Sequence, residues 1–158
     1  MKDINKVLRK LEYGVYVVTM GKGTGGNAFT ASWVMQVSSE PPMIAISVHD
    51  KHQSSRLIKE SNAFVVNLIG EGQDGVAKTY YGPAESGYDK LKGTTVKDSP
   101  VTQTPLIPGA IGYFDCQLVN AVTAGNHTIY IGEIKAAELD DEVQQLMTTT
   151  NSKLHYTG

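Results

Sequence analysis

The segment from Asp50 to Arg56 (DKHQSSR) contains the residue types that hold a phosphate group. It lies between an apolar run that predicts a strand and a stretch that predicts a helix, so main-chain N–H groups are available where the helix begins. Two serine hydroxyls and the flanking cations of Lys51 and Arg56 add hydrogen-bond donors and positive charge. An ordinary serine cap on a solvated helix, with Ser54 or Ser55 as the capping residue, explains the same residues equally well.

Histidines occur at two further places where they could meet a ligand. His49 and His52 form an H-x-x-H pair, but neither a glutamate nor a third ligand stands at useful local spacing. Two exposed loop histidines are therefore favoured, and the alternative is a role for His52 beside a phosphate. His127 follows the predicted Gly125-Asn126 turn, where a plain surface histidine competes with one aimed at a pocket. No metal site is predicted.

Trp33 is the single tryptophan, in the run Thr30-Ala-Ser-Trp. A lone tryptophan is usually part of a core, but it can also form the wall of a site for a planar ligand. The small residues beside it would let such a ring approach the main chain. No Ser-His-Asp or Cys-His arrangement can be argued from spacing, which favours a protein whose cofactor supplies the reactivity.

The glycine run from Gly21 to Gly26, with Glu40 about twenty residues on, fits the G-x-G-x-x-G dinucleotide fingerprint on paper. That fingerprint needs a helix after the glycines, and a strand-like segment follows here. We therefore predict a hairpin turn.

The predicted elements are mostly strands. Apolar and β-branched runs predict strands at 15–20, 28–38, 43–48, 64–69, 110–122 and 128–139, and helical spacing predicts helices at 3–12, 54–61 and 71–80. Asp3 is the expected cap of the first helix, and Ala31, Trp33, Met35 and Val37 are expected to share one face of the second strand. Turn signals between the strands favour a mainly β (α+β) fold, a six-stranded antiparallel barrel with a few short helices.

Length and charge exclude several classes of function. The chain of 158 residues is expected to be one domain over 1–158. Its net charge of −2 and the absence of a basic tract argue against a nucleic-acid partner. No apolar run approaches the roughly 20 residues of a membrane span. The single cysteine and the lack of an apolar leader segment make the cytoplasm the expected location.

Taken together, these segments resemble the flavin reductase-like, FMN-binding split-barrel family, whose fold has Greek-key topology. The most specific stretch is 27–38 (NAFTASWVMQVS), followed by Pro41-Pro42. Their order and spacing carry the resemblance along nearly the whole chain, through residues 13–19 (YGVYVVT), Ser47-Val48, 54–61 (SSRLIKES), 64–68 (FVVNL), Cys116, 125–128 (GNHT), 131–134 (IGEI) and Tyr156.

The resemblance implies a homodimer with FMN near the subunit interface, and it implies roles for individual residues. Those facing the isoalloxazine and ribityl chain would be Asn27, Thr30, Ala31, Ser32 and Trp33. Those along the phosphate and its approach would be Ser47, Val48, Lys51, His52, Gln53 and Ser54. Those closing the pocket would be Lys90, His127 and Tyr156. The family usually has Asp where this chain has Asn126, and Thr where it has Ser54.

The activity implied is that of an NAD(P)H-dependent flavin oxidoreductase. FMN would accept electrons from NADH or NADPH and pass them to free flavin, a ferric complex or a redox protein. His127 is the expected catalytic residue, as a group that orients the reacting rings. One alternative is a non-enzymatic, flavoredoxin-type electron carrier with tightly bound FMN. Another is a split-barrel module that binds no flavin, such as a sensor or a heme-handling relative.

Overall fold

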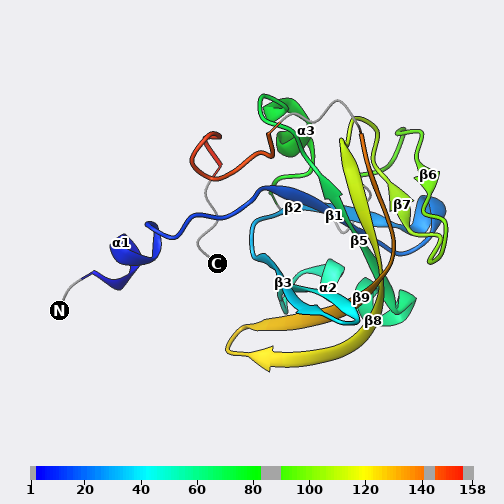
Figure 1. Ribbon diagram of the computed structural model, residues 1–158, viewed down its shortest axis with the longest axis horizontal. Coiled ribbons are helices and arrows are strands. Elements are labelled where there is room, and N and C mark those ends of the chain that lie inside the picture. The colour runs from blue at the N-terminus through cyan, green and yellow to red at the C-terminus, as the bar shows by residue number, and fades with distance from the viewer. Residues whose placement is uncertain (1–2, 83–89, 141–144, 155–158) are drawn as a thin grey trace.

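Antiparallel strands make up most of the structure, a computed structural model that describes residues 3–82, 90–140 and 145–154 (Figure 1). In chain order, the elements are α1 (Ile4–Leu8), β1 (Tyr16–Met20), the 3-10 turn η1 (Gly23–Gly25), β2 (Asn27–Ala31), β3 (Val34–Ser39), β4 (Pro42–His49), α2 (Gln53–Ser61), β5 (Ala63–Leu68), α3 (Asp74–Thr79), β6 (Lys97–Asp98), β7 (Pro105–Leu106), β8 (Gly112–Ala124) and β9 (His127–Leu139).

Seven strands form one sheet in the order β2-β1-β5-β8-β9-β4-β3, and every pairing in it is antiparallel. The two edge strands, β2 and β3, are consecutive in the chain and are separated only by Ser32 and Trp33. Because consecutive Cα atoms are about 3.8 Å apart, these two residues hold Ala31 and Val34, the adjoining ends of the two edge strands, within roughly 11 Å of each other. The sheet must therefore curl round until these two ends lie near each other.

The expectation of one continuous strand over 28–38 is wrong. The chain leaves its pairing with β1 at Ala31 and resumes pairing at Val34, now with β4. The alternating face expected for this segment is lost at the break: Ala31 is buried, whereas Met35 and Val37 are exposed. Local alternation cannot reveal that a strand changes partners, because the partner is set by long-range contacts.

The other predicted elements are present with shifted ends. The glycine run joins β1 to β2 as a hairpin and is followed by a strand, which excludes a dinucleotide-binding βα turn. Asp3 caps α1 as expected, its side chain accepting from the N–H groups of Asn5 and Lys6. The helix predicted at 71–80 is shortened to α3. No strand was predicted between 81 and 109, where the structure has the small β6–β7 ladder.

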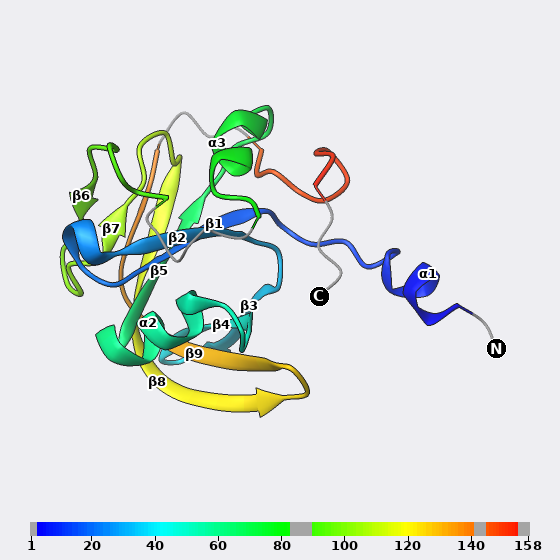
Figure 2. The same cartoon turned by 180° about the vertical axis from the view of Figure 1, so that it is seen from behind.

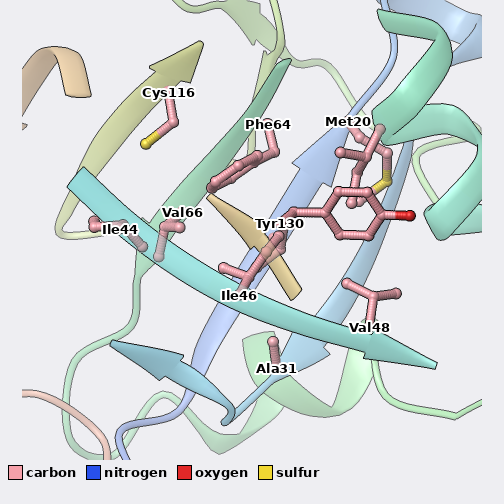
Figure 3. Close-up of a cluster of buried hydrophobic side chains, with 11 residues drawn as sticks. Met20, Ala31, Ile44, Ile46, Val48, Phe64, Val66, Cys116 and Tyr130 are labelled. Atoms are coloured by element: carbon pink, nitrogen blue, oxygen red, sulfur yellow. The ribbon is translucent and has the colours of Figure 1, made fainter. Parts of the chain in front are cut away.

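The largest core cluster lies inside the curled sheet, where Tyr130 and Phe64 are fully buried (Figure 3). The Tyr130 hydroxyl donates to the carbonyl oxygen of Ser55 at 3.1 Å and lies 2.5 Å from the Ser55 hydroxyl. Helix α2 is thereby held against the barrel at its first turn. Cys116 is buried in the same cluster, and burial raises the pKa of its thiol to about 12, so it is unreactive at neutral pH.

Among the described residues, no helix is both long and apolar enough to cross a membrane.

Gly132 in β9 should be intolerant of a side chain. A Cβ atom there would lie 2.7 Å from Cζ of Phe64 and 2.8 Å from Cβ of Cys116, both buried. We expect Gly132→Ala to lower the free energy of unfolding by about 1–3 kcal/mol through overpacking. The matched control is Gly75→Ala in α3, where a Cβ meets nothing within 4 Å. Urea denaturation of both variants gives the comparison, and an equal effect would contradict this description of the core.

Candidate functional site

A cavity of about 600 Å³ lies where the two edges of the sheet come together. Ligand pockets in proteins typically enclose about 300–1,000 Å³. Its walls come from β2, the Ser32-Trp33 connection, the end of β4, the start of α2 and residues 80–82 and 90. They consist of Asn27, Phe29, Thr30, Ala31, Ser32, Trp33, Ser47, Val48, His49, Lys51, His52, Gln53, Ser54, Tyr80, Tyr81, Gly82 and Lys90.

The structure brings nearly all of the predicted site residues together. Every one of them lines this cavity except His127 and Tyr156. The ring of His127 lies just outside the lining, 4.9 Å from the Trp33 ring between centroids. Tyr156 lies outside the described residues. That these residues bind a cofactor stays a prediction.

Helix α2 begins at the cavity with unused donors. Its N-cap is His52, which makes no side-chain capping bond, so the expectation of a Ser54 or Ser55 cap is wrong. The main-chain N–H groups of Gln53 and Ser54 find no acceptor among the described residues. Ser54 and Ser55 instead lie within the first turn of α2, which begins at Gln53. The Ser55 side chain is buried against Tyr130 and is not available to cap the helix. Such a helix start suits an anion.

Gln53 contributes a second unused polar group at the same place. Its Oε1 is buried and has no hydrogen-bond partner among the described residues. A buried acceptor without a partner costs about 1–3 kcal/mol, so a ligand that donates to it would be stabilised. A ribityl hydroxyl or a flavin ring N–H is a donor of that kind. The residues present therefore fit a flavin mononucleotide.

Arg56 does not take the phosphate-side position expected for it. Its guanidinium pairs with Glu60 one turn along α2, at 2.9 Å, on an exposed face of the helix. Arg56 is absent from the cavity wall, whereas Lys51 is part of it. Positive charge at this end of the cavity thus comes from Lys51 and the helix start.

Lys90 lies against residues 80–82, which form another part of the cavity wall. Its Nζ donates to the carbonyl oxygens of Tyr80 at 2.8 Å and Gly82 at 2.6 Å. The Tyr80 carbonyl also accepts from Thr30 N–H at 3.0 Å, which fastens this segment to the outer edge of β2. Burial lowers the pKa of Lys90 below its usual value.

Three histidines cluster beside the cavity, on two paired strands and the start of α2. The His49 ring stacks on His52 at 5.4 Å between centroids and lies 5.0 Å from His127. The prediction that His49 and His52 are exposed loop residues is wrong for His49, which is the last residue of β4 and is half-buried. The backbone explains the cluster, because His49 and His127 are direct partners in the β4–β9 ladder.

Two histidines of this cluster, His52 and His127, have pKa values below the usual value for histidine. Burial lowers the pKa of His127, and His49 lowers it further, against an opposing effect of Asp50. Burial also lowers the pKa of His52, helped by His49, Lys90 and His127. The neutral imidazole is therefore the resident form of His52 and of His127 at pH 7. Among the described residues, no group of three His, Cys, Asp or Glu side chains is placed to hold a metal ion.

Sequence reasoning missed five residues of the wall: Phe29, His49, Tyr80, Tyr81 and Gly82. Phe29 lies within the stretch 27–38 that the sequence analysis singled out. Its position next to the predicted site residue Thr30 was the signal that could have found it. Tyr80 and Tyr81 follow a weakly patterned helix. The bond from Thr30 N–H to the Tyr80 carbonyl oxygen, which local patterns cannot predict, joins this segment to β2.

Comparison with known proteins identifies the class. The flavin reductase like domain family matches residues 8–158. The NADH:FMN oxidoreductase of Rhodococcus qingshengii is 30% identical over 142 residues, which cover 89% of this chain and 72% of that protein. The NADH:FAD oxidoreductase SgcE6 of Streptomyces globisporus has the same fold, with a TM-score of 0.82 and 25% identity over 92% of this chain and 86% of that one. It has also been solved in complex with NAD and FAD fragments.

Some relatives are longer proteins. The high molecular weight rubredoxin of Moorella thermoacetica is 31% identical over 84% of this chain but only 58% of its own length. The chain spans about a quarter of the length of the diflavin flavoproteins that it matches.

The antiparallel sheet has the fold of the flavin reductases, so the predicted mainly β, split-barrel fold class is confirmed. The main sheet has seven strands where six were expected, because segment 28–38 forms two strands. The chain belongs to the flavin reductase like domain family, as its resemblance predicted. This membership supports an NAD(P)H-dependent flavin oxidoreductase with a flavin cofactor.

The lowered pKa of His127 predicts a stability effect in mild acid. The unfolded chain takes up a proton as the pH falls through about 6.5, whereas folded His127 resists protonation until a lower pH. The stabilisation is therefore present above pH 6.5 and is lost as the pH falls below it. We expect His127→Gln to flatten the decline in the free energy of unfolding between about pH 6.5 and 5. Urea denaturation across this range measures it, and an unchanged slope would contradict the assignment.

Proposed function

We propose that this chain is an FMN-binding oxidoreductase that takes electrons from NADH or NADPH and passes them to a second acceptor. The observation that carries the proposal is that one cavity combines an aromatic wall with unused anion donors at a helix start. Free flavin, a ferric complex and a redox protein are the candidate acceptors. The proposed unit is a single domain over residues 1–158, working in the cytoplasm.

The phosphate of FMN would be held at the start of α2. The N–H groups of Gln53 and Ser54 and the Ser54 hydroxyl supply donors, and Lys51 supplies positive charge. Helix α2 has nine residues, enough for a useful dipole toward its first turn. These groups predict a preference for a phosphorylated flavin over riboflavin.

The isoalloxazine would lie against the Ser32-Trp33 connection. Trp33 offers an aromatic face, and Ala31 and Ser32 are small enough for a planar ring to approach the main chain. The Trp33 carbonyl is fixed by accepting from Ser47 N–H at 3.0 Å, which ties the connection to β4. The ring site is thus built on strands and does not need to be ordered by the ligand.

When bound, FMN supplies the hydride-accepting chemistry. The side chains of this cavity would bind and orient the two rings and exclude water. His127, in contact with Trp33 and His49, would orient the nicotinamide or flavin by hydrogen bonding. The named relatives support this reading, since one is an NADH:FMN oxidoreductase and another was solved with fragments of both NAD and a flavin.

A flavoredoxin-type electron carrier is the second candidate. It is favoured by the longer relatives, among them a high molecular weight rubredoxin, in which the matching region is one part of a larger protein. A protein acceptor would then replace free flavin as the destination of the electrons.

Anaerobic reduction of the FMN-loaded protein by NADH and by NADPH tests the proposal. Loss of flavin absorbance with at least one donor, followed by steady turnover when excess FMN is added, is the expected result. Reduction of one equivalent without turnover supports the carrier. Failure of both nicotinamides to reduce bound FMN contradicts the oxidoreductase.

The phosphate site predicts selectivity for FMN. We expect FMN to bind at least tenfold more tightly than riboflavin, about 1.4 kcal/mol. Ser54→Asp places negative charge beside the phosphate and should weaken FMN by more than tenfold while changing riboflavin affinity little. Ser39→Asp, on an exposed position of β3, is the matched control. Equal affinities of the parent protein for FMN and riboflavin, measured by calorimetry, would contradict the site.

A homodimer is proposed from apolar surface that the single chain leaves uncovered. Helix α1 extends away from the barrel (Figures 1 and 2). Four apolar side chains on and just after this helix are exposed by half or more: Ile4, Val7, Leu8 and Leu11. Met35 on the edge strand β3 is exposed to a similar degree. A second copy of the chain would cover them.

We expect a dimer mass in sedimentation equilibrium and a weaker dimer when Val7→Asp and Leu8→Asp are combined. Asn5→Asp adds charge to the same helix on a polar position and serves as the control. A concentration-independent monomer that still binds FMN would contradict the dimer.

A further inference from the structure

His52 occupies the point where the cavity, the start of helix α2 and the histidine cluster meet. It is the N-cap residue of α2, directly before the N–H groups of Gln53 and Ser54 that find no acceptor among the described residues. It lines the cavity, and its ring stacks on that of His49 at 5.4 Å between centroids. Its side chain makes no capping bond, so the imidazole is not used to hold the helix. A ligand group bound at the start of α2 would therefore lie beside His52.

The groups that face His52 disfavour a proton on its ring. Burial lowers the pKa of His52, and three neighbours from separate parts of the fold lower it further: His49 of β4, Lys90 of the cavity wall and His127 of β9. Lys51 precedes it in the chain and lines the same cavity. The N-terminal end of α2 adds partial positive charge. Without a ligand, an imidazolium at this position would meet only repulsion from these groups.

The acidic groups that the structure describes nearby do not offset this positive balance. Asp50 raises the pKa of His127 but not that of His52. Glu60 pairs with Arg56 at 2.9 Å on an exposed face of α2. The charge that would favour a proton on His52 must therefore come from a ligand.

A phosphate monoester at the start of α2 would supply that charge. Such a group carries about −1.5 to −2 charges at pH 7. An opposite charge within about 4–6 Å shifts a pKa by about 1–3 toward the charged form. The two stacked rings would not both take up a proton, because like charges about 5 Å apart repel each other. Since His52 directly precedes the free N–H groups, it is the ring that gains the proton.

We propose that His52 makes this site specific for a phosphate monoester by taking up one proton from the solvent when the phosphate binds. The neutral ring becomes an imidazolium, so the site gains positive charge only when a negative ligand is present. That the monoester is the phosphate of FMN rests on the proposed function, whereas the proton uptake depends on the phosphate alone. By linkage, the affinity for FMN rises as the pH falls from about 8 to 6.5, and the affinity for riboflavin does not.

Calorimetry in two phosphate-free buffers of different ionisation enthalpy measures the proton uptake. FMN and riboflavin are each titrated into the full chain at about pH 7, where a free phosphate monoester is mostly dianionic. We expect about half a proton or more to be taken up per FMN, and none per riboflavin. In His52→Gln the uptake should disappear. The parent should bind FMN more tightly than this variant, by a factor that grows up to tenfold per pH unit as the pH falls from about 8 to 6.5.

Two further variants separate the charge of His52 from a merely structural role. Lysine is charged throughout this pH range, so His52→Lys should regain the FMN affinity lost in His52→Gln without taking up a proton. Arg56→Gln is the matched control, because it removes a cation from an exposed face of α2 that is absent from the cavity wall. It should leave both the affinity and the uptake unchanged.

Proton uptake that persists in His52→Gln overturns the proposal, as does an absence of uptake by the parent with FMN or an equal uptake with riboflavin. If FMN does not bind at all, the proposed function fails and inorganic phosphate becomes the probe. The pKa of His52 is then followed by proton NMR, with its signal identified by its loss in His52→Gln. A higher pKa in phosphate than in chloride at equal ionic strength supports the proposal, and an unchanged pKa overturns it.

Discussion

The two-residue connection between the edge strands is the constraint on which the rest of the structure depends. Strands β2 and β3 are consecutive in the chain, yet they stand at opposite ends of the sheet order. Two residues cannot bridge a flat sheet of seven strands, which at about 4.8 Å per strand would be roughly 29 Å wide. The sheet must therefore close, and Ser32 and Trp33 must lie at the closure. The cavity forms at the same point, because paired strands on both sides keep the connection in place.

Closure also explains why the polar groups of the cavity come from distant parts of the sequence. The end of β4 brings His49 opposite His127 of β9, and the chain then enters α2, whose first turn is held by the buried contact between Ser55 and Tyr130. The N–H groups that face the cavity are thus positioned by a core residue. A site of this kind is rigid before a ligand arrives, and the cost of ordering it has been met in folding.

Sequence patterns predicted much of this arrangement and failed where partners are chosen at long range. Period-two patterning located the strands, and the order of motifs led to the family and to most of the cavity wall. The break at Ser32 was missed because apolar residues recur at every second position of the sequence from Ala31 to Val37, although the structure places them on different faces. Tyr80 was missed because its place depends on one main-chain bond to Thr30.

Titration of the single tryptophan with FMN tests the central claim most directly. Trp33 is the only tryptophan of the chain and forms part of the cavity wall, so its fluorescence reports on this site alone. The account predicts strong, saturable quenching by FMN at one flavin per chain, with the same binding but no such signal in Trp33→Phe. FMN binding that leaves Trp33 fluorescence unchanged, or no FMN binding, would contradict the placement of the flavin at the closure of the barrel.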